Sequence, residues 1–78
     1  MSVHAEILKS LIERLAEKMA QRNKVYDDII ECLKTSEPDW DASLELIIHA
    51  KEIEDKIEVI MNEFGDYRSI IEELLNRI

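Results

Sequence analysis

Three side chains in the second half of the chain have the types and spacing of metal ligands. Glu45, His49 and Glu52 follow one another at intervals of four and three residues, so on a helix they share one face. Carboxylate and imidazole groups placed in this way resemble half of the di-metal site of a helical bundle, which needs paired Glu-x-x-His motifs on two helices. The sequence lacks that paired motif. We therefore interpret His49 as a solvated surface residue and expect no metal and no other cofactor.

A second group of acids lies slightly further along the chain. Glu52, Glu54, Asp55 and Glu58 resemble part of the magnesium-binding pattern of the helical nucleotide pyrophosphatases, whose carboxylates surround a triphosphate. The sequence holds only fragments of that pattern, and runs of charge on helices mostly face solvent. We expect no catalytic residue among them.

The single cysteine is also not expected to be a nucleophile. No base lies at a recognisable spacing from Cys32, and the neighbouring acids Asp28 and Glu31 oppose the thiolate that a nucleophile needs. Cys32 is interpreted as an apolar filler. The sequence therefore predicts that the protein is not an enzyme.

Basic side chains form a stripe in the first half of the chain. Arg14, Lys18 and Arg22 recur every four residues, which is a spacing that could meet phosphates. We expect instead that Asp55, Glu58 and Glu52 neutralise this stripe across a hairpin, each exposed pair contributing about 0–1 kcal/mol. Arg22 also occupies a position in an otherwise apolar seam, so it is a candidate for setting helix register or for binding an acid of a partner.

The elements that position these side chains are predicted to be helices. The chain has 78 residues, 46% of them apolar and 36% charged, with one Gly and one Pro, which is the profile of an ordered all-α protein. The first helix is expected over residues 3–34, where apolar positions alternate in steps of three and four. The nine positions of this seam are Ala5, Leu8, Ile12, Leu15, Met19, Arg22, Tyr26, Ile29 and Leu33. All of them except Arg22 are apolar or aromatic.

The only proline marks the turn between the helices. Pro38 suits the first turn of a helix, and the residue before it is biased away from helical backbone. We place the turn at residues 35–38, with Ser36 as the N-cap and Asp39 as its partner three residues on. The second helix is expected over residues 39–64, again with apolar steps of four and three.

The single glycine leaves the end of the chain open to two interpretations. Gly65 followed by Asp66 is typical of one helix ending and another beginning, which predicts a short third helix over residues 66–78. The apolar phase nevertheless continues through Tyr67, Ile71 and Leu74, and one exposed glycine costs a helix only about 1 kcal/mol. A helical extension is therefore the alternative to the break, which we favour slightly.

A single helical domain of 78 residues is expected to need a partner. So small a core contributes only a few kcal/mol, and one cysteine cannot form an internal disulfide. We expect a homodimer or higher oligomer that forms a helical bundle, related by a two-fold axis. The predicted interface residues are Tyr26, Ile29, Ile30, Leu33, Trp40, Leu44, Ile48, Ile71, Leu74 and Ile78.

Two resemblances accompany this architecture. A hairpin with Trp40, Asp41 and Ala42 at its turn resembles the small WXG-motif proteins of type VII secretion, with alanine where that family has glycine. The hairpin plan and the acidic second half are similar to Rop, the plasmid regulator whose dimeric four-helix bundle binds paired RNA hairpins. The second resemblance implies RNA binding through the first helix.

The leading functional hypothesis is a regulator or adaptor that occludes a surface of another protein. The alternative is an inhibitor or sponge, of the kind carried by phages and mobile elements, that holds a small phosphorylated ligand at a subunit interface. A net charge of −8 disfavours general binding to nucleic acid or to anionic membranes. No apolar run approaches about 18 residues and no leader pattern is present, so we expect a protein of the reducing cytoplasm.

Overall fold

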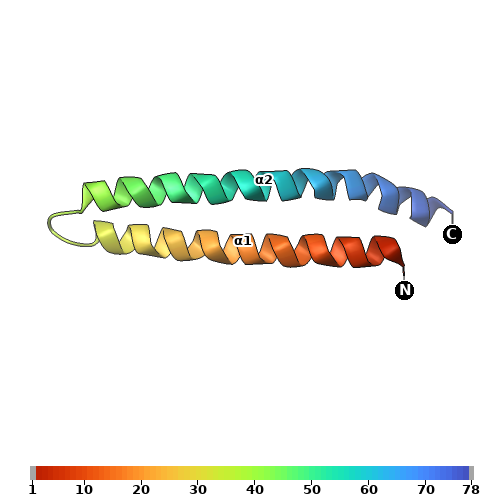
Figure 1. The fold of residues 1–78 in the computed structure, drawn as a ribbon, viewed down its shortest axis with the longest axis horizontal. Helices are drawn as coiled ribbons and strands as arrows, with labels where there is room; N and C mark the ends of the chain where they lie inside the picture. Colours follow the sequence, from red (N-terminus) through yellow and green to blue (C-terminus); the bar gives the residue numbers. More distant parts are fainter. Residues whose placement is uncertain (1, 78) are drawn as a thin grey trace.

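Two long antiparallel α-helices make up the fold. The computed structural model describes residues 2–77, with α1 at Val3–Leu33 and α2 at Trp40–Asn76. The helices lie side by side and are joined at one end, and α2 runs past the start of α1 at the other end (Figure 1). The hairpin measures 61 × 18 × 15 Å. No strand occurs in residues 2–77, so the predicted all-α hairpin is confirmed.

Both helices are long because nothing within them stops a helix. Residues 3–33 contain neither glycine nor proline, and pairs such as Lys9–Glu13 and Lys24–Asp28 join successive turns of α1. Exposed pairs at this spacing each stabilise a helix by about 0.3–0.5 kcal/mol. Neither helix, over the residues described, combines the length and apolar content that crossing a membrane requires.

The loop between the helices is capped by an aspartate. Asp39 is the N-cap of α2, where its carboxylate accepts a hydrogen bond from the Ala42 backbone N–H at 3.0 Å. Its carbonyl oxygen accepts a second bond, from the Ser43 hydroxyl at 2.7 Å. The predicted N-cap, Ser36, is wrong, because the helix begins four residues later at Trp40 and Pro38 lies in the loop before the cap.

The favoured break at Gly65 is also wrong. α2 continues through Gly65 as one helix of 37 residues, and no third helix is present in residues 2–77. Gly65 has no positive φ, and a Cβ added to it would meet no atom within 4 Å. Because Gly65 is exposed, it lowers the stability of α2 only through its poor helix propensity, by about 1 kcal/mol relative to alanine. The helix continues in spite of this cost. The predicted helix over 66–78 reaches Ile78, which lies outside the described residues.

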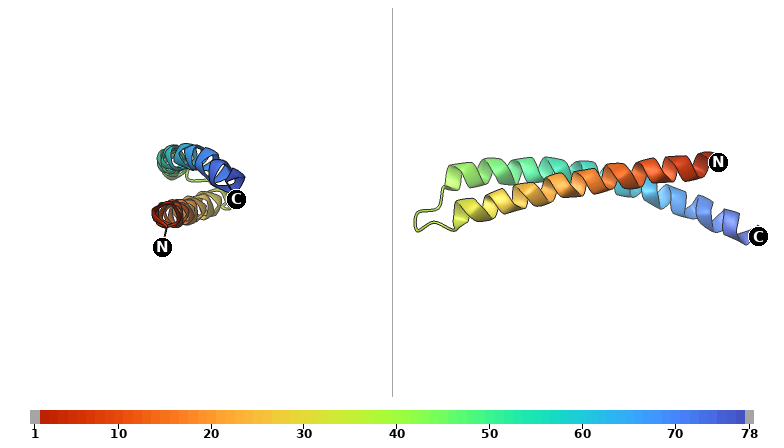
Figure 2. Two further views of the ribbon diagram at one scale, coloured as in Figure 1. Left: turned by 90° about the vertical axis from the view of Figure 1, so that its right-hand side faces the viewer. Right: turned by 90° about the horizontal axis from the view of Figure 1, so that it is seen from below.

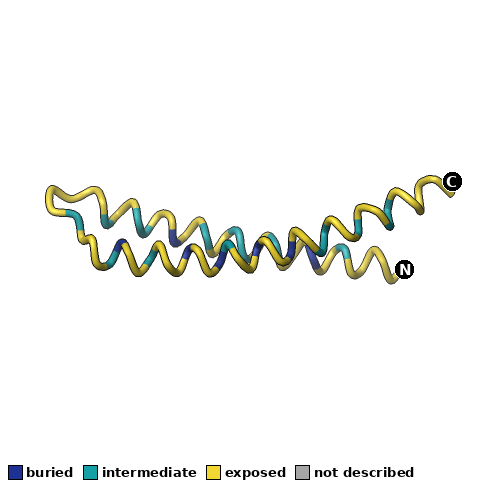
Figure 3. The backbone as a smooth tube through the Cα atoms, turned by 90° about the horizontal axis from the view of Figure 1, so that it is seen from above, coloured by how far each residue is buried: buried dark blue, intermediate teal, exposed yellow. Residues whose placement is uncertain are grey.

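The core is a single narrow row of side chains between the two helices. Its buried apolar residues are Leu11 and Val25 of α1 and Ala50, Ile53, Ile57 and Ile60 of α2. They lie along the middle of the hairpin, where the helices cross, and the ends of the hairpin are mostly exposed (Figure 3). The radius of gyration is 17.9 Å, against about 11–12 Å for a compact domain of this length.

The two helices use their apolar stripes differently. α2 buries the predicted seam, with Ala50, Ile53 and Ile57 in the core. In α1 the deepest positions, Leu11 and Val25, flank the predicted seam instead of lying on it. α1 is therefore rotated so that one edge of its wide stripe packs on α2 and the other edge has no cover within the chain.

Candidate protein interface

The uncovered edge of α1 and the adjacent edge of α2 form one apolar surface, which we call the open face. On α1 it includes Ile12, Tyr26 and Leu33, which recur at multiples of seven residues and are 49%, 37% and 43% exposed. On α2 it includes Trp40, Ile47 and Met61, at the same spacing, which are 68%, 52% and 50% exposed. Residues seven apart repeat on one side of two helices that wind around each other, so each set forms a line. The open face also includes Ile30, whereas Met19, on the same line of α1, is half-buried against the core.

One hydrogen bond shows that these two edges lie next to each other. The Tyr26 hydroxyl on α1 donates to the Glu54 carboxylate on α2, and Glu54 lies seven residues from both Ile47 and Met61. Bonding to the carboxylate raises the pKa of the Tyr26 phenol, with burial adding in the same direction. The bond fixes the alignment of the two helices in the middle of the open face.

Arg22 lies beside this bond, among the half-buried positions of α1. Its guanidinium carbon is 5.5 Å from the centre of the Tyr26 ring, and one of its terminal nitrogens is 3.4 Å from the Asn23 side-chain oxygen. Its Nε is buried and has no hydrogen-bond partner among the described residues. A buried donor without an acceptor costs about 1–3 kcal/mol of folding free energy. An acceptor from a second molecule would remove this cost.

The chain exposes more surface than a compact domain of its mass. A compact monomer of 9.2 kDa would expose about 4,900 Å². This chain exposes 6128 Å². The excess of about 1,200 Å² is more than the roughly 800 Å² that each partner buries in an interface of standard size.

The structure divides the predicted interface residues among several places. Tyr26, Ile30, Leu33 and Trp40 belong to the open face, whereas Ile29 is half-buried against the core. Leu44 and Ile48 are exposed near the start of α2, and we call this pair the tip patch. At the opposite end, Ile71 and Leu74 line a groove between the helix ends. Ile78 lies outside the described residues.

Sequence reasoning missed Ile47 and Met61. Each lies one position after a residue of the apolar seam of α2, so the pattern assigned the seam residue to the packing surface and left its neighbour unassigned. Ile47 and Met61 each lie seven residues from Glu54, and Ile47 lies seven residues after Trp40, and this repeat was the available signal. It becomes informative only once the rotation of α1 is known, because that rotation decides which flank of the seam stays uncovered.

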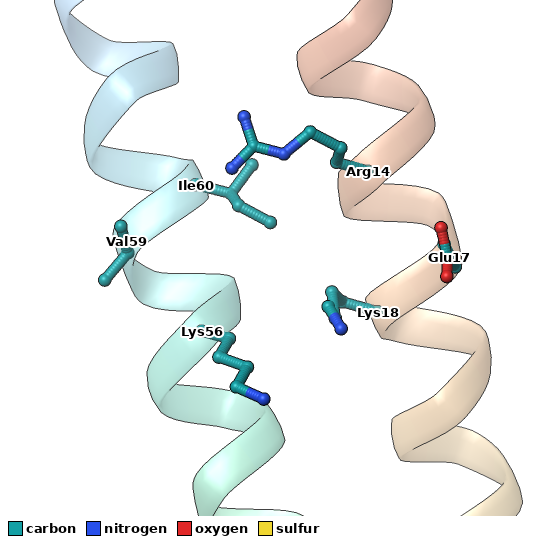
Figure 4. A pocket seen from close by; sticks show the side chains of 6 residues that line it. All are labelled: Arg14, Glu17, Lys18, Lys56, Val59 and Ile60. Carbon is teal, nitrogen blue, oxygen red and sulfur yellow. The ribbon is translucent and has the colours of Figure 1, made fainter.

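The opposite edge of the hairpin is polar. Arg14, Lys18 and Lys56 line a cleft of about 290 Å³ with Ile60 at its floor. Figure 4 shows Arg14 of α1 extending toward α2 beside Ile60, and Lys56 of α2 extending toward α1. The Arg14 guanidinium pairs with Glu63 at 3.5 Å, and Lys18 bonds Gln21 at 3.4 Å.

The expected neutralisation of the basic stripe by Asp55, Glu58 and Glu52 is therefore wrong in its partners. Asp55 pairs within α2, with Lys51 at 2.6 Å. Glu52 lies 3.8 Å from the ring of His49. Contacts within one helix, at spacings of three and four residues, form in place of pairs across the hairpin because both side chains already share one helix face.

The remaining chemical candidates do not gather into a centre. No three His, Cys, Asp or Glu side chains in residues 2–77 are placed to hold a metal ion. His49 and Glu52 are both exposed on α2. Cys32 is a free, half-buried thiol near the end of α1.

Comparison with known proteins adds no further constraint. No protein-family model, curated protein or solved structure matches the chain. The function is therefore argued from the open face, the tip patch and the cleft.

Proposed function

We propose that this chain is a non-enzymatic regulator or adaptor that self-associates as a helical bundle and acts by binding and occluding another protein. The observation that carries the proposal is the open face. An apolar line of exposed side chains from Ile12 to Met61 lies along a hairpin whose own core holds only six buried apolar residues. Such a surface favours association, since about 25 cal/mol is gained per Å² of apolar area removed from water.

The tip patch supports a second contact, with a different protein. Leu44 and Ile48 are 57% and 53% exposed near the start of α2 and, being four residues apart, they share one helix face. The acids Asp41, Glu45 and Glu52 lie within one turn of them. An apolar pair bordered by acids fits an apolar groove rimmed by lysine or arginine.

The test is a pull-down from native extract with matched variants. Leu44→Ala combined with Ile48→Ala should lose the stoichiometric partner that the unmodified chain retains, while the mass of the self-associated form stays unchanged. Val59→Ala is the control, because Val59 is as exposed as Leu44 but lies elsewhere on α2. Equal recovery of the partner by all the variants would contradict binding through the tip patch. Recovery of no stoichiometric partner by any form would contradict the adaptor role.

A second candidate function is favoured by the basic cleft. Three cations from two helices line the cleft, together with the carboxylate of Glu17, although the chain carries a net charge of −8. Among residues 2–77, Lys18 and Lys56 form no ion pair, so both are available to a phosphate. The candidate ligand class is a small phosphorylated molecule, such as a nucleotide.

A thermal shift assay with nucleotides tests this second function. Ligand at 100-fold excess over its Kd should stabilise the folded chain by about 2.7 kcal/mol. Lys18→Gln combined with Lys56→Gln should abolish that shift. Lys51→Gln is the matched control, since Lys51 is bound to Asp55 outside the cleft. Absence of any shift with the unmodified chain would rule out this candidate.

A further inference from the structure

We propose that the open face is closed by a second copy in a head-to-tail arrangement, with the loops at opposite ends and Trp40 of each copy seated in a groove at the far end of the other. This inference rests on the self-association proposed above. It adds the orientation of the two copies and the residues that determine it.

The two ends of the hairpin have complementary shapes. At the loop end, Trp40 is 68% exposed, which makes it the most exposed large side chain of the open face. At the other end the helices diverge, as the view from below shows (Figure 2). Between them lies an apolar groove of about 260 Å³, lined by Ala5, Leu8, Tyr67, Ile71 and Leu74. A buried tryptophan in an apolar groove is a common anchor of protein interfaces.

A two-fold axis across the hairpin brings these features together. Arg14 lies opposite Glu63, and His4 lies beside Tyr67. With this alignment of the helices, Trp40 is level with the end of α1, and the groove is level with the first turns of α1. The point midway between the two levels is near residues 19–23 of α1. Rotation about an axis through that point carries Trp40 of one copy onto the groove of the other.

The polar group of the open face lies at that same midpoint. Arg22 and Glu54 are level with each other there, beside the bond between Tyr26 and Glu54. In the symmetric pair, α1 of one copy packs along α1 of the other, so Arg22 and Glu54 of both copies form one polar layer at the axis, within an otherwise apolar contact. Such a polar layer fixes the register of the two hairpins.

Charge selects the head-to-tail orientation over the alternative with both loops at one end. Residues 27–45, which surround the loop, contain seven acids and one base. Residues 63–77, at the other end, contain four acids and two bases, and residues 2–14 contain two of each. Placing two loop ends together would set the most acidic regions side by side, whereas the head-to-tail pair separates them.

The excess exposed surface of the chain is large enough for a contact with a second copy. It amounts to about 1,200 Å² per chain, which exceeds the roughly 800 Å² that each side of a standard interface buries. The partner also needs a long apolar face of the same length, which a second copy supplies.

Spin-label distance measurement tests the orientation. With Cys32→Ser and Thr35→Cys, each chain carries one label in the loop. The head-to-tail pair should give a distance of roughly 40 Å, from about 14 residues on each side of the midpoint at 1.5 Å per residue. Loops at one end would give roughly 15–25 Å, since neighbouring helices are 8–10 Å apart, and would overturn the inference. No dipolar coupling at concentrations far above micromolar would overturn self-association itself.

Two substitutions test the anchor separately. Trp40→Ala should raise the dissociation constant of the pair at least tenfold. Ile48→Ala should leave it unchanged, because Ile48 belongs to the tip patch and not to the open face. Equal dissociation constants for the unmodified chain and Trp40→Ala would remove Trp40 from the interface, whatever the distance in the labelled pair.

Discussion

Tyr26 is the residue whose chemistry reports most directly on the packing of the two helices. Its hydroxyl donates to Glu54, and this raises the pKa of the phenol above its ordinary value of about 10.0. The contribution of the bond to folding is therefore complete below pH 10 and is lost as the pH rises through the raised value. The stability of the hairpin should fall with rising pH in that alkaline range.

A tyrosinate absorbance titration measures this effect. In a Tyr67→Phe background only Tyr26 contributes, and its midpoint should lie above the ordinary value for tyrosine. Adding Glu54→Gln should lower the midpoint, because the charged acceptor that favours the protonated phenol is gone. An unchanged midpoint after Glu54→Gln would mean that the two side chains are not bonded in solution.

Arg22 allows a second prediction at the scale of one side chain. Arg22→Met keeps the apolar stem and removes the buried Nε that lacks a partner. In the dissociated chain at high dilution it should raise the free energy of unfolding by about 1 kcal/mol, as measured by urea denaturation. A loss of stability of that size would show that the guanidinium is bonded within the single hairpin.

The unusual position of Arg22 was predictable from the sequence, whereas most ion pairs were not. A charged residue in an apolar seam is conspicuous, and the structure places Arg22 at the edge of the core. Lys51 had acids available on its own helix and across the hairpin, and only the geometry shows that it takes Asp55. Exposed pairs differ by less than about 1 kcal/mol, so a sequence does not decide between them.

At the scale of elements, the start of α2 depends on Asp39. Asp39→Ala should lower the free energy of unfolding by about 1 kcal/mol, because the Ala42 N–H loses its acceptor. Ser36→Ala is the matched control and should change stability little, since Ser36 lies in the loop before the cap. Thermal or urea unfolding of both variants provides the comparison. A larger loss from Ser36→Ala than from Asp39→Ala would contradict the observed start of α2.

Gly65 tests the continuity of α2. Gly65→Ala should raise the free energy of unfolding by up to about 1 kcal/mol, because alanine favours helix and its Cβ meets no neighbouring atom. Circular dichroism during urea unfolding measures both helix content and stability. If Gly65 instead ended one helix with positive φ, the same substitution would destabilise the chain.

The elements were predictable in kind but not in rotation. The heptad pattern indicated two long helices, and the structure contains α1 and α2. The apolar stripe of α1 is wide, so the sequence did not show which edge packs on α2, and the buried residues Leu11 and Val25 lie outside the predicted seam. The break at Gly65 was favoured because glycine followed by aspartate matches helix punctuation. An exposed glycine within a strong apolar repeat costs less than ending the helix.

At the scale of the whole molecule, shape and surface argue together for association. The hairpin is 61 Å long with a core one line of side chains wide, and its open face runs along the hairpin from the loop past the midpoint. A bundle of two hairpins would convert that line into a core with four helices around it. Length and composition led us to expect a partner, but the position of the open face follows only from how the two helices pack.

Sedimentation equilibrium of the purified full chain tests the central claim most directly. One chain has a mass of 9.2 kDa. At micromolar concentrations we expect twice that mass or a higher multiple, falling toward the single-chain mass on dilution and falling sooner with Trp40→Ala. A folded chain that keeps the mass of one copy at every concentration, up to millimolar, would contradict the account.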